Sequence, residues 1–297
     1  MLNFKSIEKS DINEYKKYHD YSIAMSCDDN MLNAYLWRNV YRIKFAVYNE
    51  TLIKAYFNDD GSMPGYCMPT GKDVAGALEQ IMADAKERNI KPEFIILTAS
   101  QKDMLETLYP SEFQFFDSPE NQNYLYLTED LVRLEGRKFH SKRNHISRFY
   151  KTYGDAHFET LDSSNQADAL KVVRLWNKEN SVNSDVYKEY DVIKEALELR
   201  EEYGMQGAIL YVDKKPVAMT LGSEISDKVF DINFEKALRE YGGVYAVINH
   251  EFAKTLTKYQ YINREDDMGI EGLRKAKMSY NPHLILKMFS AKPKEKN

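Results

Sequence analysis

The order of predicted secondary-structure elements repeats itself once along this chain of 297 residues. In each half, hydrophobic periodicity and turn signals predict two helices, three antiparallel strands, and then helix, strand, helix and strand. The halves share this order without sharing residues. Because the chain is about twice as long as a typical domain of ~150 residues, the repeat predicts two copies of one α+β fold. Each copy is expected to hold a mixed, mostly antiparallel sheet flanked by helices.

The expected elements follow from runs of apolar residues bounded by turn residues. No Gly-x-Gly-x-x-Gly run follows a predicted strand, which excludes a doubly wound nucleotide-binding fold. In the first half we expect helices at 10–19, 30–39, 74–89 and 101–109, and strands at 41–48, 51–57, 65–68, 93–99 and 124–127. In the second half we expect helices at 164–180, 189–203, 244–259 and 270–280, and strands at 206–212, 216–225, 229–234, 261–263 and 283–289.

Composition narrows the class of protein. The chain is 43% hydrophobic and 29% charged, as in ordinary soluble globular proteins. Its net charge of −5 argues against general DNA binding, which needs a basic surface. No run reaches the ~20 apolar residues of a membrane span, and the charged N-terminus does not have the pattern of a signal peptide, so a cytoplasmic protein is expected. Cys27 and Cys67 are expected to be reduced thiols.

Residues 131–153 form a basic segment in this otherwise acidic protein. Its apolar residues recur at roughly helical intervals, which predicts a helical connector with one face packed on a domain. The basic side chains would either form solvated surface ion pairs of ~0–1 kcal/mol each or contact the phosphates of a ligand. The candidate ligand-binding residues of this connector are Lys138, Lys142, Arg143 and Asn144.

A second cluster of charged residues lies between Tyr261 and Pro282. Crowding with a neighbouring carboxylate would raise the pKa of Asp266 or Asp267 and suit either to act as a general base, with Tyr280 protonating the leaving group. Arg274 and Lys277 are three residues apart, so they share a helix face and would meet a phosphate or carboxylate. In the alternative interpretation the acidic residues only stabilise the helix N-terminus, and Lys277 is a surface lysine. The six histidines are scattered, so no metal site is expected.

Several of these residues also carry a resemblance to a known family. They are Trp37-Arg38-x-x-Tyr41, Lys142-Arg143-Asn144 with Phe149, Asn263-Arg264-Glu265-Asp266-Asp267-Met268-Gly269, and Gly272-Leu273-Arg274-x-x-Lys277-x-x-Tyr280-x-Pro282. With them the chain resembles tandem acyltransferases of the GNAT superfamily. More narrowly, it is similar to the family related to the C-terminal domain of phosphatidylglycerol lysyltransferases, and distantly to Fem-type transferases.

The resemblance implies a first GNAT-like domain at 1–130, the connector at 131–153 and a second GNAT-like domain at 154–297. It adds Asn263 and Arg264 to the expected ligand-binding residues. Where GNAT enzymes bind the pyrophosphate of acetyl-CoA, only Gly242 and Gly243 remain of the usual glycine loop. The implied function is acyl or aminoacyl transfer to an amine or hydroxyl, with aminoacyl-tRNA or acyl-CoA as donor and no certain cofactor. A small anionic or acylated substrate is expected, and tRNA is a possible partner. A binding protein without turnover and an acetyl-CoA-dependent N-acetyltransferase are the alternatives.

Overall fold

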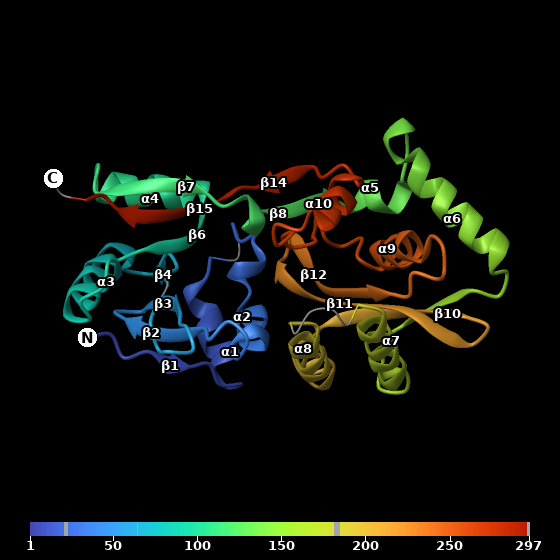
Figure 1. The fold of residues 1–297 in the computed structure, drawn as a ribbon, viewed down its shortest axis with the longest axis horizontal. Helices are drawn as coiled ribbons and strands as arrows, with labels where there is room; N and C mark the ends of the chain where they lie inside the picture. The colour runs from blue at the N-terminus through green and yellow to red at the C-terminus, as the bar shows by residue number, and fades with distance from the viewer. Residues whose placement is uncertain (21–22, 64, 181–184, 296–297) are drawn as a thin grey trace. The chain divides into compact units, whose positions relative to one another are not determined.

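A computed structural model describes residues 1–20, 23–63, 65–180 and 185–295. The chain forms two compact units, each built on one β-sheet with helices against it (Figure 1). The first unit contains Met1–Asn123, Asp266–Arg274 and Ile285–Asn297, and the second contains Tyr124–Glu265 and Lys275–Leu284. Within the described ranges no helix is long and apolar enough to cross a membrane.

The sheet of the first unit is mostly antiparallel. Its strands lie in the order β1 (Lys5–Ser6), β2 (Lys44–Tyr48), β3 (Thr51–Tyr56), β4 (Gly65–Tyr66), β6 (Phe94–Thr98), β15 (Met288–Pro293) and β7 (Phe113–Asp117), and β5 (Thr70–Gly71) pairs with β3. The predicted hairpin β2–β3 is confirmed. Its turn residues Asn49 and Glu50 both have positive φ, 44° and 56°, as a two-residue turn that matches strand twist requires.

Among its described residues the first unit contains the α-helices α1 (Asp11–Tyr15), α2 (Met31–Trp37), α3 (Val74–Glu87) and α4 (Ala99–Leu108). Helix α3 buries Leu78 and Ile81 in a core with Phe94 and Leu97 of β6. Strands β4 and β6 are parallel and pair only at Tyr66 and Phe94. Beyond that pair the two strands have no ladder contact, and side chains that follow each of them line a common cavity.

The sheet of the second unit has seven strands in the order β14 (Leu284–Leu286), β8 (Asn123–Leu127), β13 (Tyr261–Asn263), β12 (Val229–Ala237), β11 (Lys215–Ser226), β10 (Gln206–Val212) and β9 (His157–Thr160). The predicted antiparallel meander β10–β11–β12 is confirmed. Its helices are α5 (Thr128–Arg133), α6 (His140–Thr152), α7 (Gln166–Glu179), α8 (Asp185–Leu199) and α9 (Val244–Thr255). Helix α10 (Glu271–Met278) begins in the first unit and ends in the second.

The compact units do not follow the linear boundaries expected at residues 130 and 153. Strand β8, expected at 124–127 as the last strand of the first half, pairs with β13 in the second sheet. The expected strand at 283–289 is two strands, β14 and β15, and β15 lies between β6 and β7 of the first sheet. Strands β7 and β9 were not expected, because their alternating segments are short and carry several polar residues. Sequence periodicity predicts a strand but does not name its neighbour.

Candidate functional site

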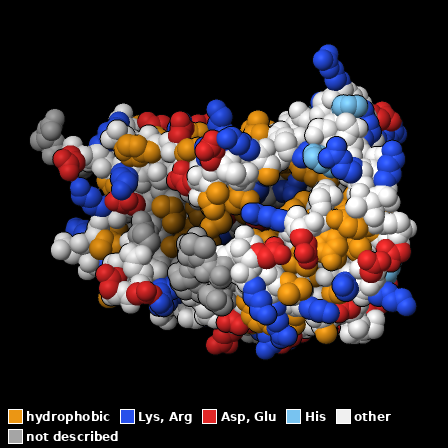
Figure 2. Space-filling view, turned by 45° about the vertical axis from the view of Figure 1, so that its right-hand side comes forward, with side chains coloured by type: hydrophobic (Ala, Val, Ile, Leu, Met, Phe, Trp, Pro, Cys, Tyr) orange, Lys and Arg blue, Asp and Glu red, His pale blue; other side chains and the backbone are white. Residues whose placement is uncertain are grey.

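Two of the four candidate residues of the basic connector, Arg143 and Asn144, bond to the connector itself. Arg143 donates from Nη1 to the carbonyl oxygens of Leu134 and, at 2.8 Å, Gly136. Leu134 ends α5 with φ 49°, so Arg143 stabilises a turn there. The Lys138 ammonium pairs with a carboxylate of α5, that of Asp130, at 2.7 Å. The Asn144 amide lies 3.1 Å from the His140 ring on the next turn of α6. Lys, Arg and His side chains gather at the upper right of Figure 2, the part where Figure 1 places α6.

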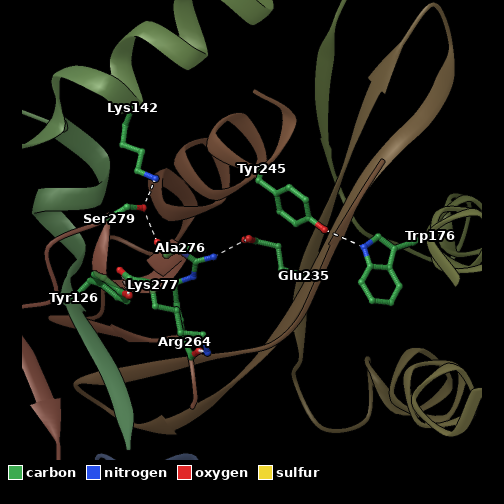
Figure 3. A network of polar contacts seen from close by, with 9 residues as sticks. All are labelled: Tyr126, Lys142, Trp176, Glu235, Tyr245, Arg264, Ala276, Lys277 and Ser279. Carbon is green, nitrogen blue, oxygen red and sulfur yellow. Dashed lines mark hydrogen bonds and ion pairs between the residues drawn. The ribbon is translucent and has the colours of Figure 1, made fainter. Parts of the chain in front are cut away.

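Lys142 is the connector residue that reaches the second charged cluster. Its Nζ donates to Ser279 Oγ at 2.6 Å, and Ser279 Oγ donates to the carbonyl oxygen of Ala276 at 2.5 Å (Figure 3). The ammonium also lies 3.6 Å from the centre of the Tyr280 ring. Burial, helped by the nearby Arg264 guanidinium, lowers the pKa of Lys142 to about 8. At neutral pH this lysine therefore exchanges its proton more readily than an ordinary surface lysine.

The centre of the cluster is an ion pair between Arg264 and Glu235. Arg264 Nη2 lies 2.8 Å from Glu235 Oε1, and the two side chains are 15% and 8% exposed. In Figure 3, Glu235 extends from β12 toward Arg264, which follows β13. The other atoms of the two groups, Arg264 Nη1 and Glu235 Oε2, are buried and have no hydrogen-bond partner among the described residues. A buried donor and a buried acceptor without partners are costly, so this pair is suited to receive polar groups of a ligand.

Tyr280 completes the cluster. It is buried, with the Arg264 guanidinium 4.9 Å from its ring centre and the Tyr126 ring edge-on at 6.4 Å. Burial raises the pKa of the Tyr280 hydroxyl to about 12, although Arg264 works in the opposite direction. The hydroxyl is therefore protonated at neutral pH and can donate a proton.

Lys277 and Asn263 hold the backbone around the cluster. Lys277 Nζ donates to the carbonyl oxygen of Arg264, and the Lys277 carbonyl accepts from Tyr126 Oη at 2.9 Å. Asn263 is fully buried, and its Oδ1 accepts from the backbone N–H of Glu265 at 2.7 Å. These bonds give both residues a positioning role beside Arg264.

Asp266, Asp267 and Arg274 belong to the first unit. Asp267 is fully buried and forms two hydrogen bonds with Arg274, at 2.8 and 2.9 Å, while its Oδ1 also accepts from Gly269 N. Asp266 Oδ1 accepts from Met268 N at 3.1 Å. A carboxylate held in this way stabilises the turn before α10, which matches the structural alternative for the acidic residues. We therefore assign the role of general base to neither aspartate.

Gly242 and Gly243 precede α9. Gly243 has φ 94°, and a Cβ built on it would lie 2.8 Å from the backbone oxygen of His145 in α6. The first turn is already bonded, since Val244 N donates to Tyr241 O and Ala246 N to Gly243 O. Gly243 thus permits a close approach of α6 to this helix start, and little of the helix N-terminus remains for a pyrophosphate.

Sequence reasoning missed Glu235 and the aromatic residues beside it. Trp176 Nε1 donates to Tyr245 Oη at 3.0 Å, and the Lys236 ammonium lies 4.1 Å from the Trp176 ring centre while pairing with Glu189 at 2.8 Å. The available signal was the adjacent pair Glu235-Lys236 near the end of β12, where the alternation of apolar and polar residues along the strand stops. On its β13 side, β12 is paired only over Val229–Asp231, so its last residues border an unpaired strand edge. No group of three potential metal ligands occurs among the described side chains.

The chain is similar to several known proteins. The sequence model of the family described as "Phosphatidylglycerol lysyltransferase, C-terminal" matches residues 22–292. A crystal structure of a conserved protein of unknown function from Bacteroides thetaiotaomicron is 34% identical, with 99% of this chain and 100% of that chain covered and a TM-score of 0.91. The structure of L-PGS from Bacillus licheniformis is 11% identical, with 99% and 94% covered and a TM-score of 0.68.

Two further similarities concern the fold and the extent of the match. A GNAT-family acetyltransferase from Colwellia psychrerythraea is 10% identical, with 99% and 100% covered and a TM-score of 0.54. With L-PGS it confirms the expected fold, mixed sheets flanked by helices in tandem GNAT-like units. The uncharacterized protein MYCGA3080 of Mycoplasmoides gallisepticum is 23% identical over 172 residues, 57% of this chain and 56% of that protein. The chain therefore spans just over half the length of this curated relative.

Proposed function

The chain belongs to the family of the phosphatidylglycerol lysyltransferase C-terminal domain, and from this premise we propose that it transfers an aminoacyl group. In this proposal the donor is an aminoacyl-tRNA and the acceptor carries an amine or a hydroxyl. The reaction would take place in the second unit, around Lys142, Glu235, Arg264 and Tyr280. Because charged tRNA is a cytoplasmic substrate, the proposal places the protein in the cytoplasm.

The observation that carries this proposal is the pair of buried atoms without partners, Glu235 Oε2 and Arg264 Nη1. An aminoacyl group offers an ammonium to the first and a carbonyl oxygen to the second. An acetyl group offers only the carbonyl oxygen, which would leave the carboxylate oxygen of Glu235 buried and unpaired. Leaving such an atom unpaired costs about 1–3 kcal/mol, so the pair favours an acyl group that carries an amine.

The other two residues supply proton transfer. The amine nitrogen or hydroxyl oxygen of the acceptor attacks the ester carbonyl carbon, and the neutral form of Lys142 accepts the proton that this atom loses. The new bond to carbon forms, the bond to the ribose oxygen breaks, and Tyr280 Oη donates a proton to that leaving oxygen. After the attack and before the ester bond breaks, Arg264 stabilises the negative charge that develops on the carbonyl oxygen. A proton passed from Lys142 to Tyr280 restores both groups.

The exposed basic residues of α6 would contact the tRNA backbone. Arg148 and Lys151 are exposed on this helix, and their charges attract phosphates without reading sequence. A salt-dependent affinity for charged tRNA follows from this arrangement. Acyl-CoA is the less favoured donor, because Gly243 lies against α6 and the residues before α9 do not form a phosphate loop.

The test is a transfer assay with tRNA carrying a labelled amino acid and a panel of amine and hydroxyl acceptors. We expect transfer by the wild type and a loss of about a hundredfold or more in Lys142→Met, since general base catalysis contributes about 10²–10⁴-fold. Lys171→Met, which replaces an exposed lysine of α7 in the same unit, is the matched control and should retain transfer. No transfer with any charged tRNA would contradict the proposal. Turnover of acetyl-CoA would support the alternative donor, and a tightly bound ligand without turnover would support a binding protein.

A further inference from the structure

Two hollows in the first unit differ in the room that they offer. The cavity around Lys54, where β4 and β6 part, holds about 20 Å³ of free space, enough for a single water molecule. An open groove lined by the N-terminal segment, β2, the end of β3 and the end of α3 holds about 360 Å³, within the range of about 300–1,000 Å³ typical of small-molecule sites. The groove therefore has room for a ligand, and the proposed transfer reaction does not use it.

Two phenylalanine rings form the apolar side of the groove. Phe4 and Phe57 lie edge to face with their centres 5.5 Å apart, and both pack against the core of the first unit. The centre of the Phe4 ring also lies 6.2 Å from that of Tyr66, which is buried. Each ring is thus fixed by the core and is still only partly buried, so together they offer a preformed apolar surface to a flat ligand.

Lys44 supplies a positive charge beside this surface. It is half-buried in β2 and lies on the same face of the strand as Ala46, which belongs to the core. Its ammonium lies 4.7 Å from the centre of the Phe57 ring. Within the described ranges no carboxylate pairs with Lys44 and no group forms a hydrogen bond with its ammonium. Because a lysine ammonium has three N–H groups, this charge is available to an anion.

Arg88 carries a second positive charge in the lining, and that charge is already balanced. Its Nε lies 2.7 Å from Asp84 Oδ2, and its Nη2 donates to the carbonyl oxygen of Leu2 at 3.0 Å. Asp84 is 1% exposed and also accepts from Leu2 N at 2.7 Å. Arg88 and Asp84 therefore fix the N-terminal segment that carries Phe4. Lys44 leaves the side chains of the lining with one uncompensated positive charge.

We propose that this groove binds a small aromatic anion, a flat ring that carries a carboxylate or a phosphate. The ring would lie against Phe4 and Phe57, and the anionic group would accept hydrogen bonds from Lys44. An anion without a ring would leave the apolar surface in water, and an aromatic amine would be repelled by the charge of Lys44. The groove belongs to the first unit, so the proposal goes beyond the transfer reaction proposed for the second unit.

Calorimetric titration of the full chain in the absence of tRNA tests this proposal. The probes are naphthalene-2-carboxylate and adenosine monophosphate, with acetate as the anion without a ring and 2-naphthylmethylamine as the aromatic cation. We expect at least one of the two aromatic anions to bind with a Kd of about 1 mM or lower and more tightly than acetate. Binding of the naphthoate alone would identify the ligand as a carboxylate, and binding of the nucleotide alone would identify it as a phosphate.

Substitutions of Lys44 test the role of its charge. Lys44→Met should weaken the bound aromatic anion about tenfold to a hundredfold, since it removes a charged hydrogen bond, whereas Lys44→Arg keeps the charge and should retain binding. Lys72→Met is the matched control from the same unit, because Lys72 is exposed and pairs with Glu50 at the surface.

Phe57→Leu provides an independent variant if Lys44→Met unfolds, which circular dichroism would reveal. It should weaken the aromatic anion, because leucine lacks the ring surface. The proposal is overturned if neither aromatic anion binds at about ten millimolar, if 2-naphthylmethylamine binds as tightly as the naphthoate, or if Lys44→Met binds as well as the wild type. Because these measurements involve no tRNA, their failure would leave the proposed transfer reaction to be judged by its own assay.

Discussion

Substitution of Glu235 by Gln is the most direct test of how the second unit is built. The change keeps the shape of the side chain and one oxygen that Arg264 can bond, but it removes the negative charge of a pair that is 8% and 15% exposed. Breaking a buried ion pair costs about 3–5 kcal/mol. Because Gln retains a hydrogen bond and the pair keeps some exposure, we expect Glu235→Gln to lower the free energy of unfolding by about 2–3 kcal/mol.

Urea unfolding is followed by tryptophan fluorescence in a Trp37→Phe background, in which Trp176 is the remaining tryptophan, so the signal reports on the unit that contains the pair. Trp176 is suited to the purpose, because its Nε1 bonds to Tyr245 beside Glu235. The matched control is Glu251→Gln, which removes a partner of Lys254 at the edge of α9, where the two side chains are 20% and 43% exposed. A surface pair of this kind contributes about 0–1 kcal/mol.

A second substitution separates the unpaired charge from the loss of packing. In the double variant Glu235→Gln, Arg264→Met, no guanidinium is left uncompensated, so we expect it to recover part of the lost stability. The reasoning is refuted if Glu235→Gln costs no more than Glu251→Gln. It is also refuted if the double variant loses more stability than the sum of the losses in the single variants Glu235→Gln and Arg264→Met. Since Glu235 raises the pKa of Lys142 and of Tyr280, both pKa values should fall in Glu235→Gln, which NMR titration would detect.

Three further outcomes follow from the structure. The pKa of Lys142 in the folded protein is about 8, below its ordinary value of 10.5, so the unfolded chain binds more protons than the folded protein between these two pH values. The charged lysine therefore destabilises the fold most below pH 8. Lys142→Met should raise the free energy of unfolding most below pH 8, and the gain should shrink toward pH 10.5, as measured by urea unfolding at a series of pH values. Gly243→Ala should cost about 2 kcal/mol or more in thermal unfolding, because φ is 94° and His145 O blocks the Cβ, whereas Gly242→Ala, with open space around it, should cost little. Asp267→Asn should cost about 2 kcal/mol through the loss of its bonds to Arg274, while Asp266→Asn should stay near wild type in the same measurement.

Local order was largely predictable from the sequence. Helix α7, the hairpin β2–β3 and the meander β10–β12 lie where apolar periodicity and turn residues placed them. These elements depend on neighbours in the chain, and the chain carries that information. The partner of a strand depends on residues far away. For this reason the strand expected at 124–127 was placed in the wrong half, and the one expected at 283–289 was not divided between the two sheets.

Only part of the candidate site could be predicted from the sequence, for the same reason. Lys142, Arg264, Lys277 and Tyr280 lie in conspicuous charged runs, and the structure brings them together in the second unit. Glu235 gave only a weak signal, because a carboxylate next to a lysine at a strand end resembles a solvated pair until its Arg partner is known. The cavity around Lys54 was not predictable for a related reason, since its lining comes from five separate segments of the chain.

The place of β15 has a consequence for how this chain folds during synthesis. Strand β15 (Met288–Pro293) is hydrogen-bonded on both sides, to β6 and to β7, and it leaves the ribosome after the whole second unit. Domains ordinarily fold in the order in which they are made. Here the unit that begins first is completed last, because β6 and β7 cannot be joined until β15 arrives. Until then each of these strands presents an open edge, so the nascent first unit is exposed to pairing with other chains and to chaperone binding.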